Sequence, residues 1–132
     1  MYYSTHLIAG ATVGYLTGDP IVGFVAGTVS HALLDTVPHH DFKRIRFCIV
    51  DILSGSLLFL LFLLYGQPEV GMIAGAIGGI WPDIEIPLYY FDYIKKKYFP
   101  SHSGLIKHRQ ASFAPGVLVQ VAVAVTGIWI MS

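Results

Sequence analysis

The chain has 132 residues, enough for one domain with a compact core. It is 55% hydrophobic and only 12% charged, about half the charged fraction of an average soluble domain, and this imbalance favours a membrane protein. The formal net charge is zero, so bulk electrostatics predict no nucleic-acid partner. A single cysteine, Cys48, excludes a disulfide within the chain, and the sequence contains no glycine-rich phosphate loop, nucleophile elbow or paired-cysteine zinc motif.

Apolar stretches and the breaks between them predict five helices, at residues 4–17, 20–36, 45–66, 69–82 and 112–131. Gly18-Asp19-Pro20 and Gly66-Gln67-Pro68 each end one helix and start the next, with proline in its first turn. The third and fifth helices are apolar and long enough to cross a bilayer. The segment 87–99 combines three lysines with tyrosines, which predicts an amphipathic helix lying in the headgroup plane.

An internal repeat relates the second predicted helix to the fourth. Sliding the sequence by 48 residues makes seven of eighteen positions identical: Gly18, Pro20, Val22, Gly23, Ala26, Gly27 and Asp35 fall on Gly66, Pro68, Val70, Gly71, Ala74, Gly75 and Asp83. The repeat predicts two related helical hairpins, 4–36 and 45–82, followed by the C-terminal helix 112–131. The expected fold is therefore all-α, a polytopic membrane protein of about five helices that forms a single domain over residues 1–132.

The basic residues predict how this domain sits in the membrane. All eight lysines and arginines fall on the side shared by the N-terminus, the loop 37–46 and the loop 83–111. The opposite turns carry only Asp19 and Glu69 as charged residues. The positive-inside rule then predicts an integral protein of the cytoplasmic membrane, with the basic side facing the cytoplasm.

Three stripes of small residues run through the apolar helices at a spacing of four. They are His6, Gly10, Gly14, Gly18; Gly23, Gly27, His31, Asp35; and Gly71, Gly75, Gly79, Asp83. Residues four apart share one face of a helix, and ridges of small residues let helix backbones approach closely. We therefore expect several helices to pack around one polar focus.

The polar ends of these stripes predict a metal site. Ionisable groups in apolar helices are costly unless they are paired or bind a cation. His31 and Asp35 point the same way at a spacing of i, i+4, as two-ligand helical metal motifs require. The full predicted ligand set is His6, His31, Asp35, His39 (with His40 as its alternative), Asp83 and His102. Mixed imidazole and carboxylate donors favour Zn²⁺, with manganese or iron as alternatives. Without a metal, these residues would be hydrogen-bonded pairs, interfacial histidines and solvated loop residues.

Two further carboxylates are candidate general bases for a metal-activated water. Asp51 lies about two turns into the helix 45–66, where an isolated carboxylate usually has a function or a partner, and Arg46 or His31 could be that partner. Glu85 follows Asp83 beyond the end of the fourth helix and is an alternative ligand. Lysines and arginines near the same mouth would hold an anionic lipid headgroup or a phosphoester.

These motifs resemble those of the membrane-bound, predicted metal-dependent hydrolases of the YdjM type. Ser30-His31-Ala32-Leu33-Leu34-Asp35 is similar to that family's Ser-His-x-x-x-Asp motif, and His6 fits its histidine on an N-terminal helix. Pro82-Asp83-Ile84-Glu85 resembles its Pro-Asp motif, while His102-Ser103-Gly104 resembles its His-Arg-Gly motif less closely. The chain departs from the pattern in having Glu85 in place of a second aspartate and in the order of the motifs.

The resemblance implies an all-helical fold, a divalent metal and hydrolysis of a phosphoester or lipid substrate. Two other functions remain open from the residues alone. One is a small cation or proton transporter or channel, in which Asp51, His31 and Asp35 relay the ion. The other is a noncatalytic membrane partner subunit that uses its glycine ridges only for packing.

Overall fold

The computed structural model describes residues 1–132, and its secondary structure is helical, without strands. The elements in chain order are α1 (Tyr3–Thr17), α2 (Pro20–Thr36), α3 (Ile45–Tyr65), α4 (Val70–Ile80), the 3-10 helix η1 (Trp81–Ile84), α5 (Glu85–Tyr90), α6 (Pro100–Ser103) and α7 (Phe113–Met131). Each of the five long predicted segments is thus helical, with ends that differ from the prediction by a few residues.

The turn between α1 and α2 follows from local chemistry. Gly18 has a φ of 65°, a left-handed conformation that glycine adopts without a steric penalty. The Asp19 carboxylate then accepts hydrogen bonds from the backbone N–H groups of Ile21 (2.9 Å) and Val22 (2.8 Å), which caps α2. Pro20 occupies the first turn, where its missing N–H costs nothing. This turn sends α2 back alongside α1.

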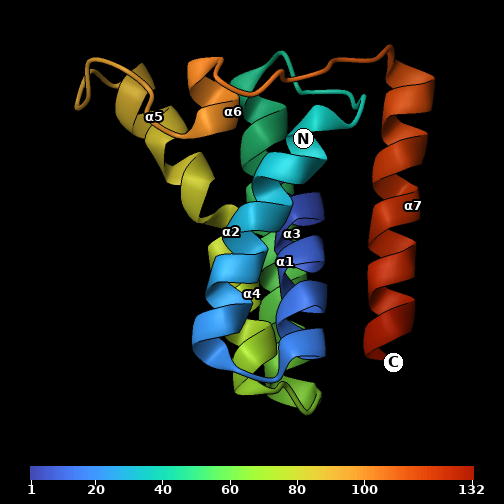
Figure 1. Ribbon diagram of the computed structural model, residues 1–132. Helices are drawn as coiled ribbons and strands as arrows, with labels where there is room; N and C mark the ends of the chain where they lie inside the picture. The colour runs from blue at the N-terminus through green and yellow to red at the C-terminus, as the bar shows by residue number, and fades with distance from the viewer.

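Helices α1, α2 and α4 pack into one tight unit at the centre of the molecule, with α7 standing to one side (Figure 1). Glycines make this contact possible. A Cβ on Gly71 would lie 2.7 Å from the carbonyl oxygen of Gly14, and one on Gly27 would collide with the carbonyl of Gly75. The predicted glycine ridges are therefore confirmed as backbone-to-backbone contacts. The buried apolar core beside them is small: Leu7, Ala11, Met72 and Ala76.

Helices α3 and α7 are the two that are long and apolar enough to cross a membrane. Only 6% of the most apolar stretch of α3 and 17% of that of α7 is buried, so neither is the enclosed core helix of a globular domain. Helices α1, α2 and α4 are too short to be counted as candidate membrane spans. The all-α prediction is confirmed, whereas a polytopic membrane protein of about five helices is not, because only two helices are candidate membrane spans.

The two predicted hairpins are not arranged alike. Helices α2 and α4 do meet at glycines that the repeat pairs, since Gly23 faces Gly71 and Gly27 faces Gly75. However, α1 packs directly on α2, whereas α3 contacts α1 and stands away from α4. A cavity of about 160 Å³ lies among α1, α3 and α4, lined almost entirely by apolar side chains. The structure therefore does not confirm the hairpins 4–36 and 45–82 as repeated units.

The predicted helix at 87–99 is wrong beyond Tyr90. Helix α5 ends there, Asp92 adopts a φ of 61°, and residues 91–99 form turns. The cause lies upstream, because the Glu85 carboxylate accepts hydrogen bonds from the backbone N–H groups of Tyr98 (2.7 Å) and Phe99 (3.1 Å). This contact folds the chain back toward η1 instead of letting it continue as a helix.

Candidate metal centre

One end of the helical unit gathers segments that are far apart in the sequence (Figure 1). The loop after α2 is joined there to the loop after α6 by backbone hydrogen bonds. The His39 N–H donates to the Arg109 carbonyl (3.2 Å), the Ala111 N–H donates to the His39 carbonyl (2.7 Å), and the Arg109 N–H donates to the Asp35 carbonyl (3.1 Å). This pairing brings His39 and His108 beside the last turn of α2.

The Asp35 carboxylate lies at the centre of this end and is only 1% exposed. Its Oδ2 accepts a hydrogen bond from the Ser101 hydroxyl at 2.7 Å. Four imidazole nitrogens lie 3.3 to 3.7 Å from its two oxygens: His6 Nε2, His31 Nε2, His102 Nε2 and His108 Nδ1. A buried carboxylate ringed by imidazoles from α1, α2, α6 and the following loop is a donor set suited to a cation.

Hydrogen bonds set the orientation of three imidazoles. His31 Nδ1 lies 2.7 Å from the Gly79 carbonyl, His39 Nδ1 lies 2.7 Å from the Val37 carbonyl, and His102 Nδ1 lies 2.8 Å from Glu85 Oε1. Because these oxygens can only accept, each Nδ1 carries the proton and donates it. Each Nε2 then offers a lone pair toward the centre, which is the arrangement that outer partners impose on metal-binding histidines.

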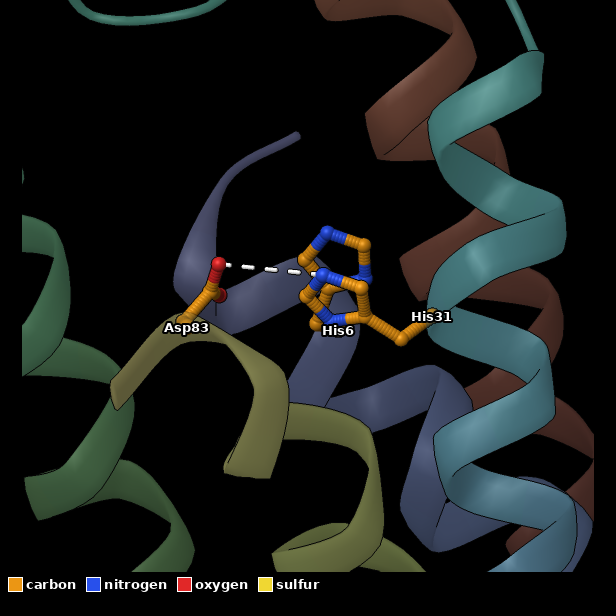
Figure 2. A group of neighbouring side chains, drawn as sticks. All are labelled: His6, His31 and Asp83. Carbon is orange, nitrogen blue, oxygen red and sulfur yellow. Dashed lines mark ion pairs between the residues drawn. The ribbon is translucent and has the colours of Figure 1, made fainter. Parts of the chain in front are cut away.

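Three groups of side chains bring their potential ligand atoms within 4.8 Å of one another. They are His6, His31 and Asp83; His31, Asp35 and His102; and Asp35, His39 and His108. Figure 2 shows the first group, in which the ring of His6 stacks on the ring of His31 and Asp83 approaches from η1. His31 belongs to two of the groups, and so does Asp35, so the three form one continuous cluster.

His6 is the least satisfied member of the cluster. The side chain is 1% exposed, and neither ring nitrogen has a hydrogen-bond partner, although Nε2 lies 3.3 Å from Asp35 Oδ1. Leaving a buried polar group unpaired costs about 1–3 kcal/mol. A cation bound beside His6 and His31 would supply the missing partner.

Three groups of this end that lie outside the long helices have shifted pKa values. Hydrogen bonds to Asp35 and Asp41 raise the pKa of His108 to about 9. Burial favours the neutral form of Asp41, but hydrogen bonds from His108 and His39 outweigh it and hold the pKa of Asp41 well below its usual range. Burial lowers the pKa of His102, which keeps this imidazole neutral and able to bind a metal. Asp41 is thus held as an anion at this end.

All six predicted metal ligands lie in the cluster: His6, His31, Asp35, His39, Asp83 and His102. Of the alternatives His39 and His40, the structure brings in His39, while His40 Nδ1 lies 3.0 Å from the Tyr2 hydroxyl. Glu85 contacts the cluster only through His102. Asp51 belongs to none of the three groups, because its carboxylate accepts the backbone N–H of Ser4 at 3.3 Å, at the start of α1.

The predicted site omits three side chains that the structure places against the cluster: Asp41, Ser101 and His108. The sequence gives one local indication of Asp41, which follows His39 by two residues and can turn toward it in a loop. His108 enters the site through the backbone pairing of two distant loops, and Ser101 enters it on α6 through the hydrogen bond to Asp35.

A comparison with known proteins finds no family model, curated protein or solved structure that matches this chain. The resemblance to the YdjM-type hydrolases therefore rests on the short motifs alone.

Proposed function

We propose that this protein is a membrane-bound, metal-dependent hydrolase whose centre lies at the cytoplasmic face of the membrane. One observation carries the proposal. The Nε2 atoms of His31 and His102 lie 3.3 Å apart beside Asp35, and each ring has its Nδ1 proton committed elsewhere. Two lone pairs directed at each other repel unless a cation lies between them. A divalent metal satisfies both lone pairs and the buried carboxylate.

The donor set of imidazoles and carboxylates favours Zn²⁺. Such an ion lowers the pKa of a bound water and polarises the bond to be cleaved. Asp83 is the carboxylate best placed to take the water's proton, because it is 28% exposed at the edge of the cluster and its Oδ1 lies 3.6 Å from His102 Nε2. Glu85, predicted as a base, has its oxygens engaged by His102 and two backbone N–H groups, which suits a positioning residue. Asp51, the other predicted base, contacts α1 instead.

The membrane location is supported by the exposed apolar surfaces of α3 and α7. The substrate that best fits this setting is a phosphoester or an anionic lipid headgroup. Its negative charge matches the basic residues of the loops at this end, which include Lys95, Lys107 and Arg109. A transporter fits less well, because the polar groups gather at one end while glycine contacts close the rest of the unit formed by α1, α2 and α4.

Substituting His31 tests the metal assignment. We expect detergent-purified wild-type protein to contain stoichiometric divalent metal and to hydrolyse a chromogenic phosphate ester. His31→Ala should lose the metal and the activity while still inserting into membranes, because it removes a ligand shared by two of the three groups. His40→Ala is the matched control, since His40 lies outside these groups. Equal metal content in the His31→Ala and wild-type proteins would rule out this site.

A second experiment tests the orientation. In a Cys48→Ser background, cysteines at positions 43 and 96 should react only with reagent supplied from the cytoplasmic side, because the positive-inside rule places both loops there. A cysteine at position 69, in the turn before α4, should react only from outside. The reverse pattern would refute a cytoplasmic centre.

A further inference from the structure

We propose that this centre holds two metal ions, the second bound by His39, His108 and Asp41, with Asp35 shared between the two. The proposal rests on the proposed function and adds to it a second ion and a substrate class, the phosphoester. Asp35, His39 and His108 bring their ligand atoms within 4.8 Å of one another.

The second site has close contacts among its own members. His39 is fully buried, and its Nε2 lies 3.1 Å from His108 Nε2 and 3.1 Å from Asp41 Oδ1. His108 Nε2 lies 2.8 Å from Asp41 Oδ2. Two imidazoles and a carboxylate thus converge on one point, in the way that they do around a zinc or manganese ion.

The scaffold holds these side chains before any ion binds. The Nδ1 proton of His39 is donated to the Val37 carbonyl, so its Nε2 faces inward. The backbone of His39 is bonded on both sides to the segment that follows His108, through Arg109 and Ala111. A site built in this way loses little conformational freedom when it takes up a metal.

Asp35 stands between the two donor sets. Its Oδ2 lies 3.4 Å from His31 Nε2, 3.7 Å from His102 Nε2 and 3.6 Å from His108 Nδ1, while its Oδ1 lies 3.3 Å from His6 Nε2. Asp35 is the only residue common to the second and third ligand groups. A carboxylate that contacts both donor sets can bind two neighbouring ions, and the metals of such paired centres lie about 3.5–4 Å apart.

The local charge also favours the binding of cations. Four carboxylates lie at this end: Asp35, Asp41, Asp83 and Glu85. No lysine or arginine side chain forms an ion pair with any of them, because the one such pair in the structure is Lys95 with Asp92. The amino nitrogen of Met1 lies 2.9 Å from Asp41 and 3.3 Å from Asp35.

A pair of ions suits phosphoester hydrolysis, since one can stabilise the attacking oxygen and the other the leaving oxygen of an in-line displacement. The water oxygen bonds to phosphorus and gives one proton to Asp83. The bond from phosphorus to the ester oxygen breaks, and the departing alkoxide takes a proton from solvent. Ester and water thereby yield an alcohol and a phosphate product with one ester bond fewer.

The test counts metals in detergent-purified, full-length protein loaded with Mn²⁺. We expect two equivalents in the wild type, with an exchange-coupled electron paramagnetic resonance signal, because a shared carboxylate couples the two spins. His39→Ala should retain one equivalent with an uncoupled signal and lose roughly 100-fold in phosphate diester turnover, the order expected when one group that stabilises the transition state is removed. Asp41→Asn provides a milder second variant, and His40→Ala should remain at two equivalents.

The possible outcomes separate the two proposals. One equivalent in the wild type, unchanged in His39→Ala and Asp41→Asn, would overturn the second site and leave the proposed function standing. No metal in the wild type would overturn both. Two uncoupled ions would refute the sharing of Asp35, and turnover of a carboxylic ester in preference to the phosphate diester would refute the substrate class.

Discussion

Asp35→Asn is expected to abolish metal binding throughout the centre. The substitution keeps the size of the side chain but removes the one buried negative charge that four imidazole nitrogens surround at 3.3 to 3.7 Å. Losing an outer partner of a metal ligand typically weakens affinity by about 10–100-fold, and the loss of this central ligand should exceed that range. Metal content after dialysis, and titration of the dialysed protein with Zn²⁺, measure the effect.

Asp19→Asn is the matched control for this experiment. Asp19 caps α2 at the opposite end of the helix from Asp35, and asparagine caps a helix as well as aspartate does. Metal content and thermal stability should therefore equal those of the wild type. If Asp35→Asn binds Zn²⁺ as tightly as Asp19→Asn does, the carboxylate is no ligand and both proposals for this centre fail.

Gly27→Leu is expected to destabilise the fold and to weaken metal binding, although residue 27 contacts no ligand atom. Any Cβ at this position collides with the carbonyl of Gly75 and lies 2.9 Å from the backbone nitrogen of Gly79. Overpacking usually costs about 1–3 kcal/mol, and backbone atoms cannot turn aside as a side chain can. Forcing α2 from α4 also strains the bond between His31 and the Gly79 carbonyl. The melting temperature in detergent and the metal content should both fall.

Two other substitutions on α2 serve as controls for this experiment. Val29→Leu adds one methylene at a side chain that is 51% exposed, so it should leave both measurements unchanged. Gly27→Ala should fall between wild type and leucine, since it adds only the Cβ. If the protein is instead a noncatalytic partner subunit, Gly27→Leu should weaken its association with the partner and leave its metal content unchanged. Wild-type stability and metal content in Gly27→Leu would contradict the packing described above.

Much of the helical unit could be predicted because its causes are local. Gly18, Asp19 and Pro20 make a turn by their own backbone preferences, and glycines four apart form a ridge whatever lies against it. The same periodicity places His31 and Asp35 on one face, so the pair could be named as candidate ligands before any contact was known. The sequence by itself thus determined the helices, their close approach and six members of the cluster.

Tertiary contacts decided what the local pattern left open. His39 and His108 are 69 residues apart, and they meet only because the loops after α2 and α6 form backbone hydrogen bonds. Glu85 ends α5 early by binding the N–H groups of Tyr98 and Phe99, which no helical periodicity encodes. Likewise α3 does not pack against α4 as α1 packs against α2, although the internal repeat predicts that the hairpins 4–36 and 45–82 are alike. Pairing between distant segments depends on the whole chain's packing, so only the structure showed that one carboxylate, Asp35, lies within 3.7 Å of four imidazole nitrogens.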